Sequence, residues 1–293
     1  MPGLKIPNND WRAMITRQAE RCEEFTGKVC VNVSGGSGSA VAWSRCLEWY
    51  GHDRVIPVFA DTNSEHDDLY RFLDDCEAAF SQKLTRLNDG RNIWDVFEQT
   101  GMLRIAHAGG ACKASIELKQ KPLARHFKEC GADAIAVGLE FLEPERMQRF
   151  EQKLSPVPVL FPLTQSPRLS ECEIHEEVRR LGVKPCTVYD EGHPHNNCRK
   201  YGCILAGVSQ WAADVKMNAD GFNYSAKREA EYYDKTGFAV CRDQSNKDVK
   251  PYPLVQLRAD VHAGKEFRDD WKSQCSCMEP QPRLFTADEC FGE

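Results

Sequence analysis

The sequence lacks several features that would assign it to common classes of protein. No apolar run reaches the roughly 18 residues that a membrane-spanning helix needs, and the first residues, MPGLKIPNNDWRAM, lack the apolar core of a signal peptide. Basic residues are not in excess, since 38 Lys and Arg face 44 Asp and Glu and give a net charge of −6. This balance excludes a strongly basic nucleic-acid-binding coat. We therefore expect a cytoplasmic globular protein with no membrane partner.

Cysteine, by contrast, is abundant, with 14 residues in a chain of 293. In a reducing compartment such residues are thiols, metal ligands or redox groups rather than disulfides. Those that fall within strand or helix patterns are interpreted as small buried side chains. They are Cys22, Cys30, Cys46, Cys76, Cys130, Cys172 and Cys186.

Strand and helix patterns alternate over the first two-thirds of the chain. Short apolar or β-branched runs predict strands at 29–33, 54–60, 84–87, 133–138 and 157–161. Apolar residues three to four apart predict helices at 11–24, 40–50, 64–80, 93–100, 115–129 and 171–181. Strands separated by helices pair in parallel, so we expect an α/β fold, a parallel twisted sheet with helices on both faces.

The pattern changes beyond Pro185. Two further helices are expected at 204–217 and 227–236, and the remainder is rich in Pro, Asp and Lys with weak periodicity. The sequence therefore predicts an α/β nucleotide-binding domain at 1–184 and a cysteine-containing C-terminal region at 185–293 that packs on it. Pro57 disfavours a central position for the second strand.

A glycine-rich loop, SGGSGS at 34–39, follows the first predicted strand and precedes a helix. Glycines let successive N–H groups converge on an anion, and the helix N-terminus adds partial positive charge. The loop is neither a Walker A motif nor the dinucleotide-binding GxGxxG. A surface turn is the alternative, but the buried strand before it favours a phosphate cradle. The candidate binding residues are Ser34, Gly35, Gly36, Ser37, Gly38 and Ser39.

A second unusual segment, HPHNNCRKYGCILAG at 193–207, holds two histidines and two cysteines within eleven residues. Cysteines clustered with His, Asn and Gly in a loop are more often ligands or nucleophiles than core residues. Cys198 and Cys203, with the distant Cys112, place three thiols at one predicted sheet edge, and Cys275 and Cys277 supply one or two more. Such thiols bind iron–sulfur clusters or zinc. For zinc, His193 or His195 are candidate ligands; a site without metal is the third option.

Several segments in order resemble one protein family over about residues 28–215. They are SGGSGS at 34–39, FADTNSE at 59–65, ACKASIELKQKPL at 111–123, Gly138 with Glu143 and Arg146, FPL at 161–163, VYDEGH at 188–193, and NNC at 196–198 with Cys203. Together they resemble the phosphoadenosine phosphosulfate (PAPS) reductase-like branch of the adenine nucleotide alpha-hydrolase superfamily, the PP-loop ATP pyrophosphatases. Gly38 departs from the aspartate that is common in that family's SGGxDS loop.

The resemblance implies a set of site residues. Asp61 and Thr62 are expected to face an adenine nucleotide, and Gly138 to allow its close approach. Lys119 and Arg146 are expected to meet phosphate or sulfate oxygens and, with Cys112, to be catalytic. A 4Fe–4S cluster is implied, with ligands Cys112, Cys198, Cys203 and Cys277, and with Cys275 as the substitute for Cys277. Zn²⁺ remains the alternative metal.

Three functions are compatible with the resemblance. The first is an ATP-dependent sulfurtransferase with Mg²⁺, which adenylates an acceptor such as nucleic acid and receives sulfur from a partner such as a cysteine desulfurase. The second is a PAPS or adenylyl-sulfate reductase with a thioredoxin-like donor and Cys290 as the tail nucleophile. The third, favoured by Gly38, is a non-catalytic nucleotide-binding subunit. A homodimer is compatible with each.

Overall fold

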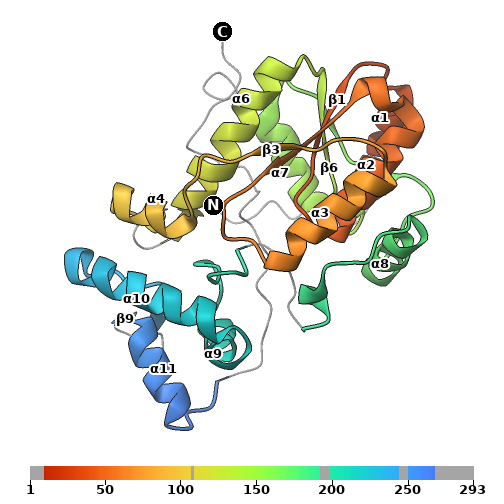
Figure 1. The fold of residues 1–293 in the computed structure, drawn as a ribbon. Coiled ribbons are helices and arrows are strands. Elements are labelled where there is room, and N and C mark those ends of the chain that lie inside the picture. The colour runs from red at the N-terminus through yellow and green to blue at the C-terminus, as the bar shows by residue number, and fades with distance from the viewer. Residues whose placement is uncertain (1–9, 107–108, 192–197, 244–249, 268–293) are drawn as a thin grey trace.

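The computed structural model describes residues 10–106, 109–191, 198–243 and 250–267. Its centre is a five-stranded parallel sheet with strand order β3-β2-β1-β6-β7, shown in Figure 1. The strands are β1 (Val29–Asn32), β2 (Val55–Ala60), β3 (Thr85–Leu87), β6 (Ala134–Val137) and β7 (Val159–Leu160). All five lie within predicted strands, and the predicted α/β fold with a parallel sheet is confirmed.

Helices cover both faces of this sheet, which is why its strands are apolar on both sides. One face packs against α2 (Ser37–Tyr50), α3 (Asp67–Ala79) and α8 (Glu171–Arg180) in a core that includes Val29 and Val31. The other face packs against α1 (Asp10–Glu24), α6 (Lys121–Cys130) and α7 (Pro144–Leu154). Cys30 lies between Val29 and Val31 on β1 and is buried.

The strand order reverses direction at β1. The chain passes from β1 through β2 to β3 on one side, then returns to β6 and β7 on the other. In open parallel sheets such a switch point forms a crevice at the carboxyl ends of the strands, where ligands bind. The loops that follow β1, β2 and β6 therefore meet at one edge, as the sequence predicts.

Pro57 does lie in an internal strand, contrary to expectation. β2 has neighbours on both sides, but β3 pairs with it only at Val58–Ala60. Pro57 is paired with Val31 of β1 and precedes the part of β2 that has an outer neighbour. Proline has no N–H to donate, but position 57 is not paired with β3, so no hydrogen bond between β2 and β3 is lost there.

The helix predicted at 115–129 runs without a break from 113 to 130 but changes its winding. It consists of α5 (Lys113–Ser115), the π-helical turn η2 (Ile116–Gln120) and α6. Pro122 lies in the first turn of α6. Proline has no backbone N–H to donate, and where the preceding turn is widened to a π-helical one, the helix does not lose a regular hydrogen bond at this position. A π turn therefore lies directly before α6, and this turn carries Lys119.

The remaining helices differ from prediction mainly at their ends. α4 (Ile93–Thr100) is as predicted, with a capping box made by Asn92 and Asp95. α2 begins at Ser37 rather than at 40, so half of the glycine-rich segment is its first turn. α3 is capped by His66, not by Ser64. α7 was not predicted.

The chain beyond the sheet forms a second core with segments that precede it in the sequence. α9 (Val208–Met217), α10 (Ala219–Thr236) and α11 (Leu254–His262) gather apart from the sheet in Figure 1. Their apolar side chains pack with those of α4 and α5. The sequence did not indicate α11 or the strand pair β8 (Cys241–Asp243) and β9 (Lys250–Tyr252).

A further strand pair precedes α5. β4 (Arg104–Ala106) and β5 (Gly109–Cys112) are antiparallel, where the sequence predicted a loop at 107–111. Cys112 ends β5 and precedes the first helical residue, so it lies at the junction of strand and helix. Within the described part of the chain, no helix is long and apolar enough to cross a membrane.

Candidate functional site

The glycine-rich loop is held by its own hydroxyl groups. Ser39 Oγ donates to the carbonyl oxygen of Gly36 at 2.8 Å and accepts from the N–H of Ser34 at 3.1 Å. Gly35 has φ +82°, and a Cβ there would lie 2.7 Å from the Leu69 side chain. Ser39 therefore shapes the loop, while the N-terminus of α2 opens at Ser37 towards the carboxyl edge of the sheet.

Gly38 and Gly138 bring two loops of this edge into backbone contact. A Cβ on Gly138 would lie 2.7 Å from both the Gly38 carbonyl oxygen and the Ser39 Cα. A Cβ on Gly38 would lie 3.2 Å from the Gly138 carbonyl oxygen. Gly138 thus permits the close approach of the 34–39 loop itself. A side chain at position 38, where the resembling family has aspartate, would make a tight contact with the Gly138 carbonyl oxygen.

Asp61 and Thr62 lie in the loop after β2, and their side chains bond within the protein. Asp61 accepts from the N–H of Asn63 and the hydroxyl of Tyr70, both at 2.8 Å. Thr62 Oγ1 donates to Glu65 Oε1 at 3.0 Å. Both residues are buried. In this structure they fix the course of the loop at the edge where a nucleotide was expected.

Glu65 is the centre of a buried polar network. Its Oε1 lies 3.0 Å from Lys119 Nζ, and the two side chains are 0% and 4% exposed. Its Oε2 accepts the backbone N–H of Cys198 at 2.9 Å. Burying two charges is costly unless they are paired and hydrogen-bonded, and here Glu65 joins three segments: the loop after β2, η2 and the 198–203 loop.

Three of the four predicted cluster ligands come together beside this network. Cys112, Cys198 and Cys203 line one pocket with Lys119 and Thr62. The other described residues of its lining are Ile93, Phe97, Ser115 and Ile204. All three cysteines are less than 10% exposed, so their thiols face a sheltered, mostly apolar space with one lysine on its wall.

The 198–203 loop has a constrained backbone. Cys198 has φ +54°, a conformation that is uncommon outside glycine and clusters at functional sites. Arg199 forms a buried ion pair with Asp214 of α9, and burial raises the pKa of Asp214 against the lowering effect of Arg199. Gly202 has φ +84°, and a Cβ there would lie 2.3 Å from the Trp211 ring. The Arg199–Asp214 ion pair and the close approach of Gly202 to Trp211 both hold the loop against α9.

Arg146 lies elsewhere at the sheet edge, in the first turn of α7, where it pairs with Glu143. Glu143 also accepts the N–H of Glu140 at 3.1 Å. Burial, and then the nearby carboxylates Glu143 and Glu171, raise the pKa of Glu140 to about 7. The sequence does not indicate Glu140, because the shift in its pKa depends on burial, which has no local sequence pattern.

His175 is a second residue that the sequence did not indicate. It comes from α8, and its Nδ1 lies 3.1 Å from Ser37 Oγ of the glycine-rich loop. Its ring packs edge-on against Tyr189 at 4.7 Å, and burial lowers its pKa. The predicted residues His193, His195, Cys275, Cys277 and Cys290 lie outside the described residues.

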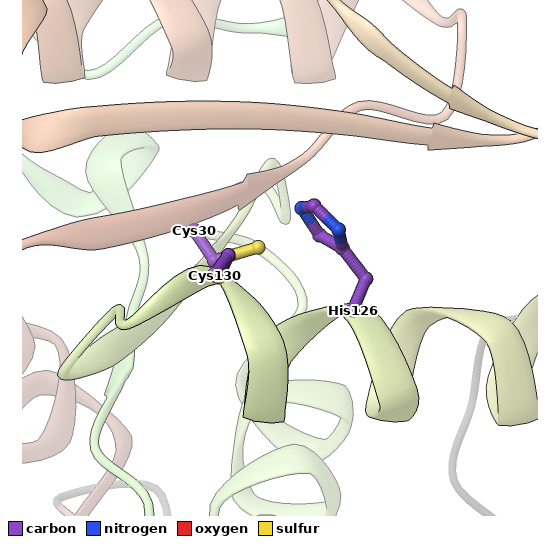
Figure 2. Close-up of side chains that lie close together, drawn as sticks. All are labelled: Cys30, His126 and Cys130. Atoms are coloured by element: carbon purple, nitrogen blue, oxygen red, sulfur yellow. The ribbon is translucent and has the colours of Figure 1, made fainter.

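A third group lies on α6 and β1, away from these loops. Cys30, His126 and Cys130 place one ligand atom each within 4.8 Å of one another. Figure 2 shows the three side chains gathered between α6 and β1. A hydrogen bond between the two thiols holds the pKa of Cys130 below its usual range and raises that of Cys30. The interpretation of Cys30 as a buried side chain is confirmed, whereas Cys130 is half-buried and Cys172 is exposed.

The comparison with protein-family models agrees with the resemblance seen in the sequence. The family model of the phosphoadenosine phosphosulfate reductase domain matches residues 28–208. PAPS reductase from Candida auris, in a phosphate complex, aligns with 67% of this chain and 97% of its own, at 14% identity and a TM-score of 0.44. NH3-dependent NAD synthetase from Campylobacter jejuni subsp. jejuni NCTC 11168, in complex with nitrate, aligns with 78% of this chain and 93% of its own, at 11% identity and a TM-score of 0.37. No curated protein matches the sequence.

Proposed function

Because this chain belongs to the phosphoadenosine phosphosulfate reductase domain family, and so to a class of nucleotide-binding enzymes, we propose that it is an ATP-dependent sulfurtransferase. In this proposal the loop at 34–39 binds the phosphates of ATP with Mg²⁺. Cys112, Cys198 and Cys203 hold a 4Fe–4S cluster. The acceptor is a compound with an oxygen that adenylation can activate, and nucleic acid is the first class to test.

The observation that carries the proposal is the convergence of three cysteines from two distant segments on one pocket. Thiolates are the ligands that hold iron–sulfur clusters, and the donor set of the pocket contains three of the four that a 4Fe–4S cluster takes. Cys277 is proposed as the fourth ligand, with Cys275 as its substitute. A bound cluster would supply sulfur in the oxidation state of sulfide, or a site through which such sulfur passes from the donor to the acceptor.

The nucleotide is proposed to bind at the switch point between β1 and β6. There the N-terminus of α2 offers N–H groups and partial positive charge to phosphate oxygens. Arg146, held by Glu143 at the same edge, is proposed to contact an anionic group. Lys119, on the pocket wall, places a positive charge between the nucleotide loops and the cysteines.

The adenylation and the later attack by sulfide each balance without a redox step. An acceptor oxygen attacks the α-phosphorus of ATP, and pyrophosphate leaves with the electron pair of the broken P–O bond. Sulfide from the donor then attacks the activated carbon or phosphorus of the acceptor, and AMP leaves with the original acceptor oxygen. The sulfur source is proposed to be a cysteine desulfurase with free cysteine, whose persulfide is reduced to sulfide by two thiols of an added thiol reductant, which ends as a disulfide.

The first test is the metal content of anaerobically purified protein. We expect about four irons and four sulfides per chain, with the broad visible absorption of a cluster, in the wild type and in the control Cys172→Ser. Cys172 is exposed on α8 and outside the pocket. In Cys198→Ala the iron and sulfide should be lost. Zinc, or no metal, in the pocket of the wild type would overturn the cluster.

The second test follows the nucleotide. Release of AMP and pyrophosphate from ATP, dependent on an acceptor and on cysteine with a desulfurase, is the expected result. Thioredoxin-dependent sulfite release from PAPS would instead make the protein a reductase. Nucleotide binding without turnover of either compound would make it a non-catalytic subunit.

A further inference from the structure

Cys30, His126 and Cys130 form a cluster that the proposed reaction does not use. Among the described residues, these three place their ligand atoms within 4.8 Å of one another. His126 and Cys130 are four residues apart on α6 and so share one face of that helix. Figure 2 shows both side chains directed at β1, which carries Cys30.

The cluster lies apart from the candidate nucleotide site and from the pocket that Cys112, Cys198 and Cys203 line. Cys30 lies near the start of β1, about 13 Å along the strand from the loop that begins at Ser34. α6 runs back across the sheet, so Cys130, its last residue, lies at the amino edge. Lys119 precedes α6 on the same continuous helix, about 11–16 Å from His126 and Cys130 along its axis.

The chemistry of the donor set is that of a zinc site. Two thiols and an imidazole suit Zn²⁺, whereas Mg²⁺ and Ca²⁺ require oxygen ligands. Tetrahedral zinc with bonds of about 2.0–2.3 Å holds its ligand atoms about 3.4–3.8 Å apart, and the observed cluster needs only small side-chain adjustments to reach that spacing.

An unsatisfied atom in the cluster independently points to a ligand. The Nε2 atom of His126 is buried and has no hydrogen-bond partner among the residues that the structure describes. A buried polar atom without a partner costs about 1–3 kcal/mol, and such atoms in folded proteins call for a missing partner such as an ion or water. A metal bound at the imidazole satisfies the ring directly or fixes its tautomer.

We propose that Cys30, His126 and Cys130 bind one Zn²⁺ ion that clamps the end of α6 to β1. The ion takes three protein ligands, and because Cys130 is only half-buried, a water molecule can complete the tetrahedron. The turn that carries Lys119 leads directly into α6. The clamp therefore holds the far end of this helix, opposite the proposed active site. The two thiol protons are released to solvent as the metal binds.

The test measures zinc per chain in full-length protein after removal of loosely bound metal. We expect Cys130→Ser and His126→Ala to contain one zinc less than the wild type, and Cys172→Ser to match the wild type. Loss of metal only in Cys198→Ala would belong to the other pocket, so the two proposals fail separately. Equal zinc in the wild type and Cys130→Ser would overturn the clamp.

Two further measurements distinguish loss of the metal site from misfolding of the variant. Metal-free wild type and metal-free Cys130→Ser should melt at similar temperatures, and added Zn²⁺ should raise the melting temperature of the wild type alone. Co²⁺ added in place of zinc should give a thiolate-to-metal charge-transfer band that weakens in Cys130→Ser. A Cys30–Cys130 disulfide in mass spectra, with no zinc uptake by the reduced protein, would show a thiol pair instead of a metal site.

Discussion

Glu65 accepts a hydrogen bond from the backbone N–H of Cys198 at 2.9 Å, across 133 residues of sequence. The same carboxylate faces Lys119 Nζ at 3.0 Å and accepts from Thr62. The loop that follows β2 therefore sets the position of a candidate metal ligand and of the lysine beside it. Cys198 has a left-handed backbone conformation, which is unfavourable for a residue other than glycine. The hydrogen bond from its N–H to Glu65 helps to stabilise that conformation.

Glu65→Gln should lower the free energy of unfolding by about 3–5 kcal/mol, since it removes the carboxylate that faces a buried ammonium group. Urea denaturation followed by circular dichroism measures the change. Asp67→Asn is a matched control because Asp67, two residues further along the chain, also contacts the 198–203 loop, through Lys200 Nζ at 2.8 Å, but its side chain is 79% exposed. We expect that control to cost less than about 1 kcal/mol. Equal losses in both variants would contradict the role given to Glu65.

Gly138→Ala should disturb the nucleotide loop. Its Cβ would lie 2.7 Å from backbone atoms of Gly38 and Ser39, which cannot rotate away as a side chain can. We expect a loss of about 1–3 kcal/mol in the free energy of unfolding and a weaker affinity for ATP by isothermal titration calorimetry. Gly207→Ala is the control, because a Cβ there meets no atom within 4 Å. Wild-type ATP affinity in Gly138→Ala would show that the two loops can separate without consequence.

The sequence predicts the sheet and its functional edge because both depend on local patterns. The apolar run at 29–33 and the glycines after it define β1 and the loop, and the parallel-sheet rule then brings loops after different strands to one edge. Cys112, Cys198 and Cys203 could be grouped on this basis. Glu65 could be placed in that edge but not in contact with Lys119, since side-chain pairing across distant segments leaves no periodic signal.

The sequence fails where tertiary contacts decide the structure. α10 begins at Ala219, eight residues before the predicted start, and its first turn contains Gly221, a residue that weakens a helix signal. That glycine is required by packing, since its Cβ would lie 1.9 Å from the Lys200 carbonyl oxygen. Cys30 and Cys130 belong to ordinary strand and helix patterns 100 residues apart. Their approach to His126 follows from the packing of α6 on β1, which no spacing rule gives.

Glu229 should make stability depend on pH. It is fully buried on α10 and accepts the N–H groups of Val240 and Leu254, and its burial raises its pKa from 4.5 to about 7. Between about pH 4.5 and 7 the folded state therefore binds a proton that the unfolded state has released. The free energy of unfolding should fall as pH rises through this window, by an amount on the order of 3 kcal/mol from this group.

Glu229→Gln should remove that part of the pH dependence, because glutamine remains neutral at every pH. The measurement is urea denaturation at several pH values from 4.5 to 8, with the difference between wild type and variant plotted against pH. Glu231→Gln is the control, since Glu231 is exposed on the same helix. Parallel curves for the wild type and Glu229→Gln would show that Glu229 does not bind a proton in this range.

Lys119 and Glu65 should be energetically coupled, and a double-mutant cycle can separate the structural role of Lys119 from its proposed catalytic one. Lys119→Met leaves the Glu65 carboxylate buried beside an apolar side chain, so that variant should lose about 3–5 kcal/mol. In Lys119→Met with Glu65→Gln both charges are absent. We expect the double variant to be more stable than the sum of the single losses predicts, by about 1–3 kcal/mol.

The double variant should fold but release no AMP from ATP, because the ammonium group proposed to face anionic groups is gone. Its stability and its turnover therefore answer different questions. Losses that add within about 0.5 kcal/mol would show that the ion pair is not a coupled unit. Wild-type AMP release in the stable double variant would remove Lys119 from the catalytic residues and leave it a residue that positions Glu65, and through Glu65 the loop of Cys198.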